Sequence, residues 1–271
     1  AAANVTLNYA IYGTAGAQVI SKNTTIPVVV TNNGANAKYN VAIGSQSLLS
    51  NQTGISNTAV GFQALFNNGD NNNTAIGMQA LYKNKSGHEN VSVGAAALYN
   101  NTTASGNVAV GFSALYTNAL GTSNTAVGYK ALEKNTSNSN TAIGYAALQN
   151  NSIGIYNTAF GANTMNNNTS GIENAAFGEL ALNINKTGNY NSVLGNHALR
   201  FGTNANNNTA IGFESLVGNN DSNNVSIGFQ SGYNNSNGEG NVFLGFKAGY
   251  NETNSNKLYI SNYNHIDTPL I

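Results

Sequence analysis

Three histidines, ten carboxylates and no cysteine are the residues of this 271-residue chain that could bind a metal or catalyse a reaction. His88, His197 and His265 do not stand at zinc-ligand spacing from one another or from a carboxylate. Without cysteine there are no disulfides, thiolate metal sites or cysteine nucleophile. No combination of serine, histidine and aspartate suggests a catalytic triad. We therefore expect no catalytic residue, no metal, no cofactor, and a protein that is not an enzyme.

Two weaker sites follow from residues that recur near fixed positions. His197 falls two residues after a recurring glycine, and three copies of it around a threefold axis could bind an ion. Lys130 occupies the same position in another copy, which favours a solvated position. Glu89, Glu173 and Glu239 each precede a recurring asparagine, and carboxylates gathered on stacked coils could bind calcium. These glutamates are not in adjacent copies, so we interpret them as solvated loop residues.

Asparagine is the dominant polar residue and occurs 54 times. Triplets of the form Asn-x-Ser/Thr are frequent and would be glycosylation sites on exposed loops in a glycosylating host. A chain so rich in asparagine, serine and threonine also produces such triplets by chance. Possible acceptors are Asn72, Asn101, Asn167 and Asn207.

Charge is sparse and balanced. Only 7% of the residues are charged, with ten basic and ten acidic side chains. Nothing in this balance attracts a nucleic acid or an anionic membrane. No stretch of 18 apolar residues could span a membrane as a helix. The small residues Ala1, Ala2 and Ala3 are typical of a processed chain, which favours an extracellular or cell-surface location.

An internal repeat decides the fold class. The run Asn-x-small-apolar-Gly occurs thirteen times. The glycines of successive copies are 17 residues apart nine times and 16 residues apart three times. The copies cover residues 40–250. A repeat of this length is typical of one coil of a parallel β-solenoid. The glycines, interpreted as corners that need a positive φ or a close approach, are Gly44, Gly61, Gly77, Gly94, Gly111, Gly128, Gly144, Gly161, Gly178, Gly195, Gly212, Gly228 and Gly245.

An asparagine stands four residues before each of these glycines. Stacked coils bring identical residues within about 4.8 Å, so their amides can hydrogen-bond in a ladder. The predicted structural ladder consists of Asn40, Asn57, Asn73, Asn90, Asn107, Asn124, Asn140, Asn157, Asn174, Asn191, Asn208, Asn224 and Asn241.

We expect two short strands in each coil, exemplified by residues 57–60 and 62–66. The large apolar residue before each glycine, such as Val60, Val110 or Ile143, is expected to point into a dry core. The small residue before it, such as Ala109 or Ala126, is expected to contact a neighbouring chain. A helix over the recurring Gln-Ala-Leu segment is the alternative, but it is too short to stand alone.

The pattern Asn-Thr-Ala-Val-Gly-Phe-Gln-Ala-Leu at residues 57–65 resembles the head repeats of trimeric autotransporter adhesins and related trimeric fibre and tail-spike surface proteins. Residues 241–252 and 256–260 extend the likeness, which covers about residues 40–268. The resemblance implies a left-handed β-roll in an intertwined or side-by-side homotrimer. We see neither the heptads of a coiled-coil stalk nor anchor strands, so the means of attachment stays open.

The ends lie outside the repeat. Residues 1–39 alternate as strands at 5–12 and 25–31, and form an N-terminal cap or assembly segment ahead of the repeat domain at 40–250. Residues 251–271 form a C-terminal cap or tail. Capping of the open solenoid edges is favoured, and donation of a terminal strand to the next molecule is the alternative.

Three functions remain open. The first is a non-enzymatic surface fibre or adhesin head, on a cell or a virion, that attaches to a host protein or glycan. The second is a structural filament subunit joined end to end. The third is a flat face that binds ice or polysaccharide through threonine and asparagine rows. Threonines such as Thr58 alternate with valines such as Val91 and Val108, which suits an interior position and disfavours the third function.

Overall fold

In a computed structural model, the structure describes residues 9–12, 17–20 and 37–262. The chain forms two compact units, Ala1–Ser123 and Asn124–Ile271, and each is described by itself. The boundary between these units falls within the repeat. The division into residues 1–39, 40–250 and 251–271 stays a prediction.

The first unit contains a hairpin and a parallel sheet. Strands β1 (Tyr9–Tyr12) and β2 (Ala17–Ile20) pair antiparallel. The predicted strand at residues 5–12 overlaps β1, whereas the one at 25–31 lies outside the described residues. Five short strands follow and pair in parallel register, one in each coil: β3 (Val41–Ile43), β4 (Thr58–Val60), β5 (Thr74–Ile76), β6 (Val91–Val93) and β7 (Val108–Val110).

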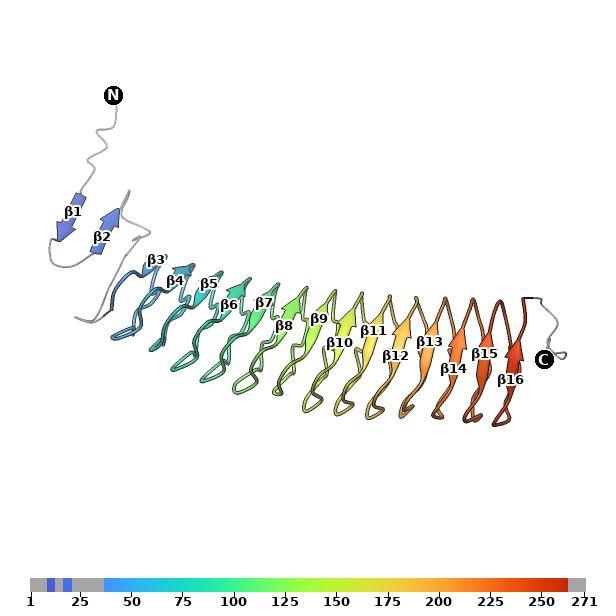
Figure 1. Cartoon of the computed structure of the whole chain (residues 1–271). Helices are drawn as coiled ribbons and strands as arrows, with labels where there is room; N and C mark the ends of the chain where they lie inside the picture. Colours follow the sequence, from blue (N-terminus) through green and yellow to red (C-terminus); the bar gives the residue numbers. More distant parts are fainter. Residues whose placement is uncertain (1–8, 13–16, 21–36, 263–271) are drawn as a thin grey trace, which may run out of the picture. The chain divides into compact units, whose positions relative to one another are not determined.

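The second unit continues the same pattern with nine parallel strands, which Figure 1 shows side by side and pointing the same way. Thr141 of one strand pairs with Thr125 and Thr158 of its two neighbours, so equivalent residues lie in rows. The strands are β8 (Thr125–Val127), β9 (Thr141–Ile143), β10 (Thr158–Phe160), β11 (Ala175–Phe177), β12 (Ser192–Leu194), β13 (Thr209–Ile211), β14 (Val225–Ile227), β15 (Val242–Leu244) and β16 (Leu258–Ile260).

The fold class predicted from the repeat is confirmed. The described chain is all-β, with fourteen parallel strands in a β-solenoid of about 13 turns. No helix occurs in the described residues, so the alternative of a helix over Gln-Ala-Leu is wrong there.

The second strand of each coil is replaced by a turn segment whose backbone alternates in φ. In the segment 62–66, Gln63 and Leu65 have φ of 57° and 49°, values outside the β region. The amides still bond between coils: Gln63 donates to the carbonyl of Ser45 and Leu65 to that of Ala80, each at 3.0 Å. The prediction of a regular strand at 62–66 is therefore wrong, although the segment stacks as a strand would.

The core lies on the opposite side of the strand from the one we expected. Ala59, Ala64 and Leu65 have no exposed surface, while Val60 is half-exposed. The same inversion places Val110 and Ile143 on the outside, so the expectation that they point into a dry core is wrong. A coil of 16 or 17 residues is narrow, and the buried leucine leaves room for only an alanine opposite it.

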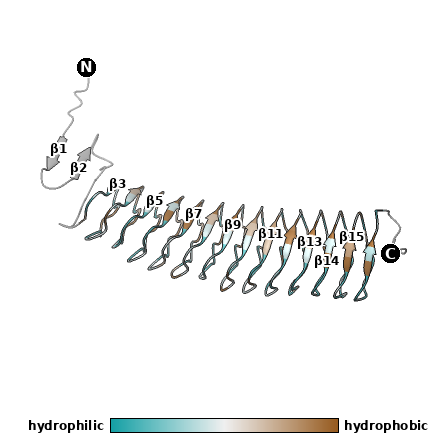
Figure 2. Ribbon diagram, in the orientation of Figure 1, coloured by the Kyte–Doolittle hydropathy of each residue, from teal (hydrophilic) through white to brown (hydrophobic). Residues whose placement is uncertain are grey.

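The alanines expected to meet a neighbouring chain instead fill this narrow core. Ala109 and Ala126 are fully buried within their own units. Figure 2 shows apolar colour on several strands and polar colour along the turns and loops that join them. The large apolar side chains at the first and third strand positions lie outward, and the core consists mainly of alanine, leucine and asparagine.

The corner glycines satisfy both reasons proposed for them. Gly61 has a φ of 133°, and a Cβ on it would lie 2.6 Å from the carbonyl oxygen of Gly77 in the next coil. No larger residue fits such a contact without moving the backbone.

Candidate functional site

The predicted asparagine ladder is buried and links each coil to the next at two points. The backbone N–H of Asn73 donates to Oδ1 of Asn57 at 2.9 Å, and Asn73 Nδ2 donates to the carbonyl of Gly87 at 2.8 Å. In the second unit, Asn157 accepts from the backbone N–H of Asn174 at 3.1 Å. We call this row the first ladder. Its role is structural, because its side-chain amides form hydrogen bonds with backbone groups.

A second buried ladder lies beside it and was missed from the sequence. It occupies the position seven residues after the corner glycine. Asn84 Nδ2 donates to Oδ1 of Asn68 at 2.8 Å, and Asn168 Nδ2 donates to Oδ1 of Asn151 at 2.7 Å. The signal was present as an asparagine that recurs seven residues after most corner glycines: Asn51, Asn68, Asn84, Asn101, Asn118, Asn135, Asn151, Asn168, Asn185, Asn219 and Asn235.

This second ladder bears on the glycosylation candidates. Asn101 is fully buried, and its Nδ2 donates to Oδ1 of Asn84 at 2.7 Å and to the carbonyl of Ala104 at 3.0 Å. The prediction of Asn101 as an exposed acceptor is therefore wrong for the folded chain. Asn72 and Asn207 are exposed and Asn167 is half-buried, so these three remain possible acceptors.

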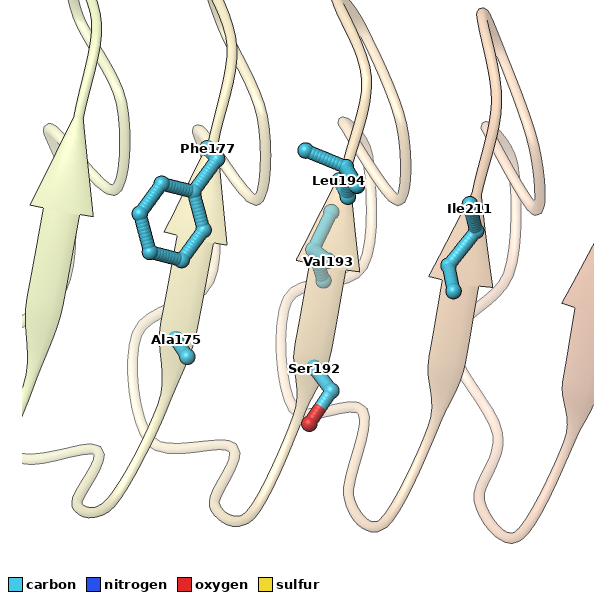
Figure 3. A pocket seen from close by; sticks show the side chains of 6 residues that line it. All are labelled: Ala175, Phe177, Ser192, Val193, Leu194 and Ile211. Carbon is cyan, nitrogen blue, oxygen red and sulfur yellow. The ribbon is translucent and has the colours of Figure 1, made fainter.

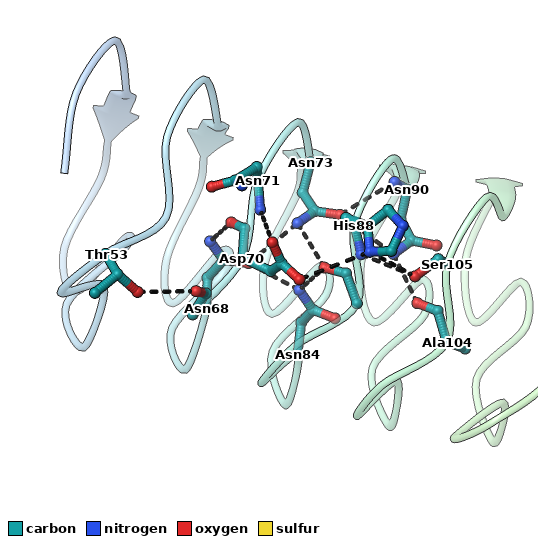
Figure 4. A network of polar contacts seen from close by, with 12 residues as sticks. Thr53, Asn68, Asp70, Asn71, Asn73, Asn84, His88, Asn90, Ala104 and Ser105 are labelled. Atoms are coloured by element: carbon teal, nitrogen blue, oxygen red, sulfur yellow. Dashed lines mark hydrogen bonds and ion pairs between the residues drawn. The ribbon is translucent and has the colours of Figure 1, made fainter. Parts of the chain in front are cut away.

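His88 and His197 each contact polar side chains on neighbouring coils and do not contact each other. His88 Nδ1 lies 3.6 Å from Oδ2 of Asp70 and 3.1 Å from Oγ of Ser105, in the loop network of Figure 4. His197 Nδ1 lies 3.8 Å from Oε1 of Glu214. His265 lies outside the described residues. Over the part that the structure describes, no three metal-ligating side chains gather.

Aromatic side chains form two rows along the coils, one and five residues after the corner glycine. Five residues after the corner glycine, Phe66, Tyr82, Tyr99 and Tyr116 stack with ring centroids 5.1 to 5.3 Å apart. Their ring faces are covered by one another, and partial burial together with the neighbouring tyrosines raises the pKa of Tyr99. The row one residue after the glycine is more exposed, as at Phe112, which is 48% exposed.

The outward side of the strands is the feature best placed to contact another molecule. We call it the sheet face, formed by the first and third residues of each strand. Ile76 in the first unit is 41% exposed, and Phe160 and Leu194 in the second are 51% and 53% exposed. Charged side chains are absent from β3 to β16, and the polar side chains on this face are threonine and serine alone.

A hollow of about 280 Å³ interrupts the sheet face in the second unit. Figure 3 shows Phe177, Leu194 and Ile211 along one side of it, at the carboxyl ends of their strands. Ala175 and Ser192 form the other side, where most strands have threonine or valine. Small residues beside large ones thus create a depression that an apolar group can enter.

The fold and its ladders define a β-solenoid repeat protein. In the comparisons with known proteins, no family model, no curated protein and no solved structure matches the chain. A search of the described residues for a helix long and apolar enough to cross a membrane found none.

Proposed function

We propose that the chain is the repeat-containing part of a non-enzymatic, extracellular surface fibre or adhesin head, and that it works as a homotrimer in which sheet faces pack together. The observation that carries this proposal is the exposure of apolar side chains in the sheet face. Exposed apolar patches larger than a few hundred Å² are uncommon on monomers and mark contacts with other molecules. Alanine and leucine cores bury little, so association would add burial that a single chain lacks.

The stacked fold also suits a mechanical role. Most coils bond to the next through backbone amides and both asparagine ladders. Attachment to a host protein or glycan would then use the loops, since the sheet faces are occupied by one another.

The test is the size of the purified full chain by light scattering. We expect a trimer at micromolar concentration. Phe160→Ser with Leu194→Ser should yield monomers that keep the circular dichroism of the parent, because both side chains lie outside the core. The matched control is Leu120→Ser, which removes a side chain 66% exposed in a loop and should leave the trimer intact. A monomeric parent chain would contradict the proposal.

One finding favours a second candidate, binding of ice or another ordered surface. The argument against it was that the recurring threonine is interior, and this is wrong: Thr125, Thr141 and Thr158 lie outward on adjacent paired strands. A measurement of thermal hysteresis separates the two functions, because a trimer would cover the threonine row. Negative-stain images of the same sample would separate discrete particles from the continuous filaments expected of end-to-end assembly.

A further inference from the structure

The residue directly before each first-ladder asparagine forms a tight turn with a positive φ. Eight of these thirteen turn residues are serine, asparagine or glycine, which tolerate this conformation best. The eight are Ser56, Asn72, Gly106, Ser123, Ser139, Asn207, Asn223 and Gly240.

Three tyrosines break this preference: Tyr39 in the first unit, and Tyr156 and Tyr190 in the second, where they lie on coils that are two apart. Tyr156 and Tyr190 have φ of 57° and 60°, a strained conformation for a bulky residue. They are 58% and 51% exposed, so burial in the chain's own core does not offset the strain. Glu173, with φ of 54°, occupies the same turn on the coil between them and is also exposed.

Backbone hydrogen bonds fix these three turns in register. The N–H of Glu173 donates to the carbonyl of Ile155, and the N–H of Tyr190 donates to that of Ile172, both at 3.1 Å. These two isoleucines replace the mostly polar residues of the other turns and make the patch locally apolar. Nothing in the described part of the chain stacks on either tyrosine ring or forms an ion pair with Glu173.

The distance between the rings of Tyr156 and Tyr190 determines the size of the group that fits between them. Rings on successive coils stack on each other, as Tyr82 and Tyr99 do at 5.1 Å, and leave no gap. Rings two coils apart stand roughly 10 Å from each other, twice the inter-strand spacing. A group midway between them lies about 5 Å from each ring, within the ~6 Å reach of a cation–π contact. The carboxylate of Glu173 lies on the intervening coil and supplies the opposite charge.

We propose that Tyr156, Glu173 and Tyr190 form a binding site for a small organic cation that carries methyl groups on nitrogen, such as the trimethylammonium group of choline. The methyl groups fill the gap between two ring faces, and the positive charge is attracted by both rings and by the carboxylate. A flat guanidinium is too thin to contact both rings at this separation. None of the three residues belongs to the sheet face.

The experiment is a titration of the full chain with choline chloride, followed by the NMR shifts of tyrosine ring protons. We expect saturable binding in the millimolar range, one site per chain. The neutral isostere 3,3-dimethylbutan-1-ol has the same shape without the charge, and should bind at least 5-fold more weakly. Equal binding of the isostere would overturn the proposal, because it would leave only apolar contact.

Three variants test the residues. Tyr156→Ser and Tyr190→Ser should each weaken choline binding about 5-fold or more, which corresponds to the loss of one cation–π contact of about 1 kcal/mol. Both should fold, because Ser123 and Ser139 occupy the same turn in other coils. Glu173→Gln should weaken binding similarly while leaving the ring signals in place.

The matched control is Glu89→Gln. Glu89 has φ of 56° in the same turn, but Asn72 and Gly106 flank it instead of tyrosines. Choline affinity should be unchanged in this variant. An equal loss of affinity in Glu89→Gln and Glu173→Gln, or no saturable binding by the parent chain, would show that the turn is not a cation site.

Discussion

Asn157 and Asn168 donate their side-chain amides to a single carbonyl oxygen, that of Gly171, at 2.7 and 3.1 Å. Asn157 belongs to the first ladder and Asn168 to the second. Asn140 and Asn151 share the carbonyl of Gly154 in the same way, at 2.9 and 2.8 Å. The two ladders are therefore joined at every such carbonyl, and they form one buried polar network rather than two separate stacks.

The two ladders should differ in their sensitivity to mutation. Asn157→Ala removes the acceptor of the buried backbone N–H of Asn174 and one donor to Gly171. Asn168→Ala removes contacts to side chains and one donor, but orphans no backbone N–H. Since each unsatisfied buried group costs about 1–3 kcal/mol, we expect a loss of about 3 kcal/mol for Asn157→Ala and about half of that for Asn168→Ala.

Urea unfolding monitored by circular dichroism measures both free energies of unfolding. The chain itself supplies a precedent for the weaker effect, because Gly202 takes the place of the second-ladder asparagine in its coil. The first-ladder asparagine is present in all thirteen copies of the repeat, and lysine (Lys257) replaces it only in the last described coil. A larger loss for Asn168→Ala than for Asn157→Ala would contradict this ranking.

Adjacent residues on one strand should respond in opposite ways to the same charge. Ala109→Asp places a carboxylate in the core, where no partner is available, and should cost about 4 kcal/mol or more. Val110→Asp places it on the sheet face in water and should cost about 1 kcal/mol or less in the dissociated chain. Far-UV circular dichroism at low protein concentration compares the two. Equal loss of structure would mean that the sides of the strand are misassigned.

The repeat length and the recurrence of glycine and asparagine were enough to predict the solenoid, because a residue that recurs every 16 or 17 positions must stack on itself. The side of the strand that faces the core was not predictable from hydrophobicity. Ala59 is smaller and less apolar than Val60, yet it is the buried one. The width of the coil decides this, and the width depends on the alternating φ of the segment that includes Leu65.

The candidate sites also differ in whether the sequence could predict them. Residues that recur in every coil, such as Asn57 and Gly61, can be assigned from spacing alone. The site of Tyr156, Glu173 and Tyr190 cannot, since it consists of departures from the repeat. It becomes visible only when equivalent turns are aligned in space and their φ and exposure are compared.

The composition of the core changes near the end of the second unit. We expect that substituting all the changed residues together restores the packing of the other coils. Phe243 takes the place of the buried alanine, while Gly232 and Gly249 take the places of leucines. A Cβ on Gly249 would lie 2.2 Å from the ring of Phe243, and one on Gly232 would lie 2.6 Å from it. The phenylalanine thus fills the space that two missing leucines leave.

We expect Phe243→Ala to cost about 3–5 kcal/mol through the cavity it leaves, and Gly249→Leu to destabilise by overpacking. The triple variant Phe243→Ala, Gly232→Leu, Gly249→Leu restores the pattern of the other coils and should recover most of the loss. Leu216 has φ of 51° at the equivalent position, so the backbone accepts leucine there. Thermal unfolding of Phe243→Ala, of the double variant Gly232→Leu with Gly249→Leu, and of the triple variant gives the coupling between the two changes. Additive losses would exclude the compensation.

The last described coil should lose stability in acid through Glu252. Oε2 of Glu252 accepts from Oη of Tyr259 at 2.6 Å, and Oε1 accepts from the backbone N–H of Asn254 at 2.8 Å and of Thr253 at 2.9 Å. Partial burial alone would raise the pKa of this carboxyl, but the hydrogen bonds outweigh burial and hold the pKa below its usual value of 4.5.

A carboxyl whose pKa is lower in the folded than in the unfolded chain stabilises the fold above its unfolded pKa, and this stability is lost as the pH falls through the folded pKa. We therefore expect the amides of Thr253 and Asn254 to be protected from hydrogen exchange near pH 7 and to lose protection below about pH 4. Glu252→Gln should lower protection at pH 7 and remove the acid-dependent loss. Glu239→Gln, a change in another loop, is the control and should keep the parent profile. An acid-dependent loss that persists in Glu252→Gln would assign it to a different group.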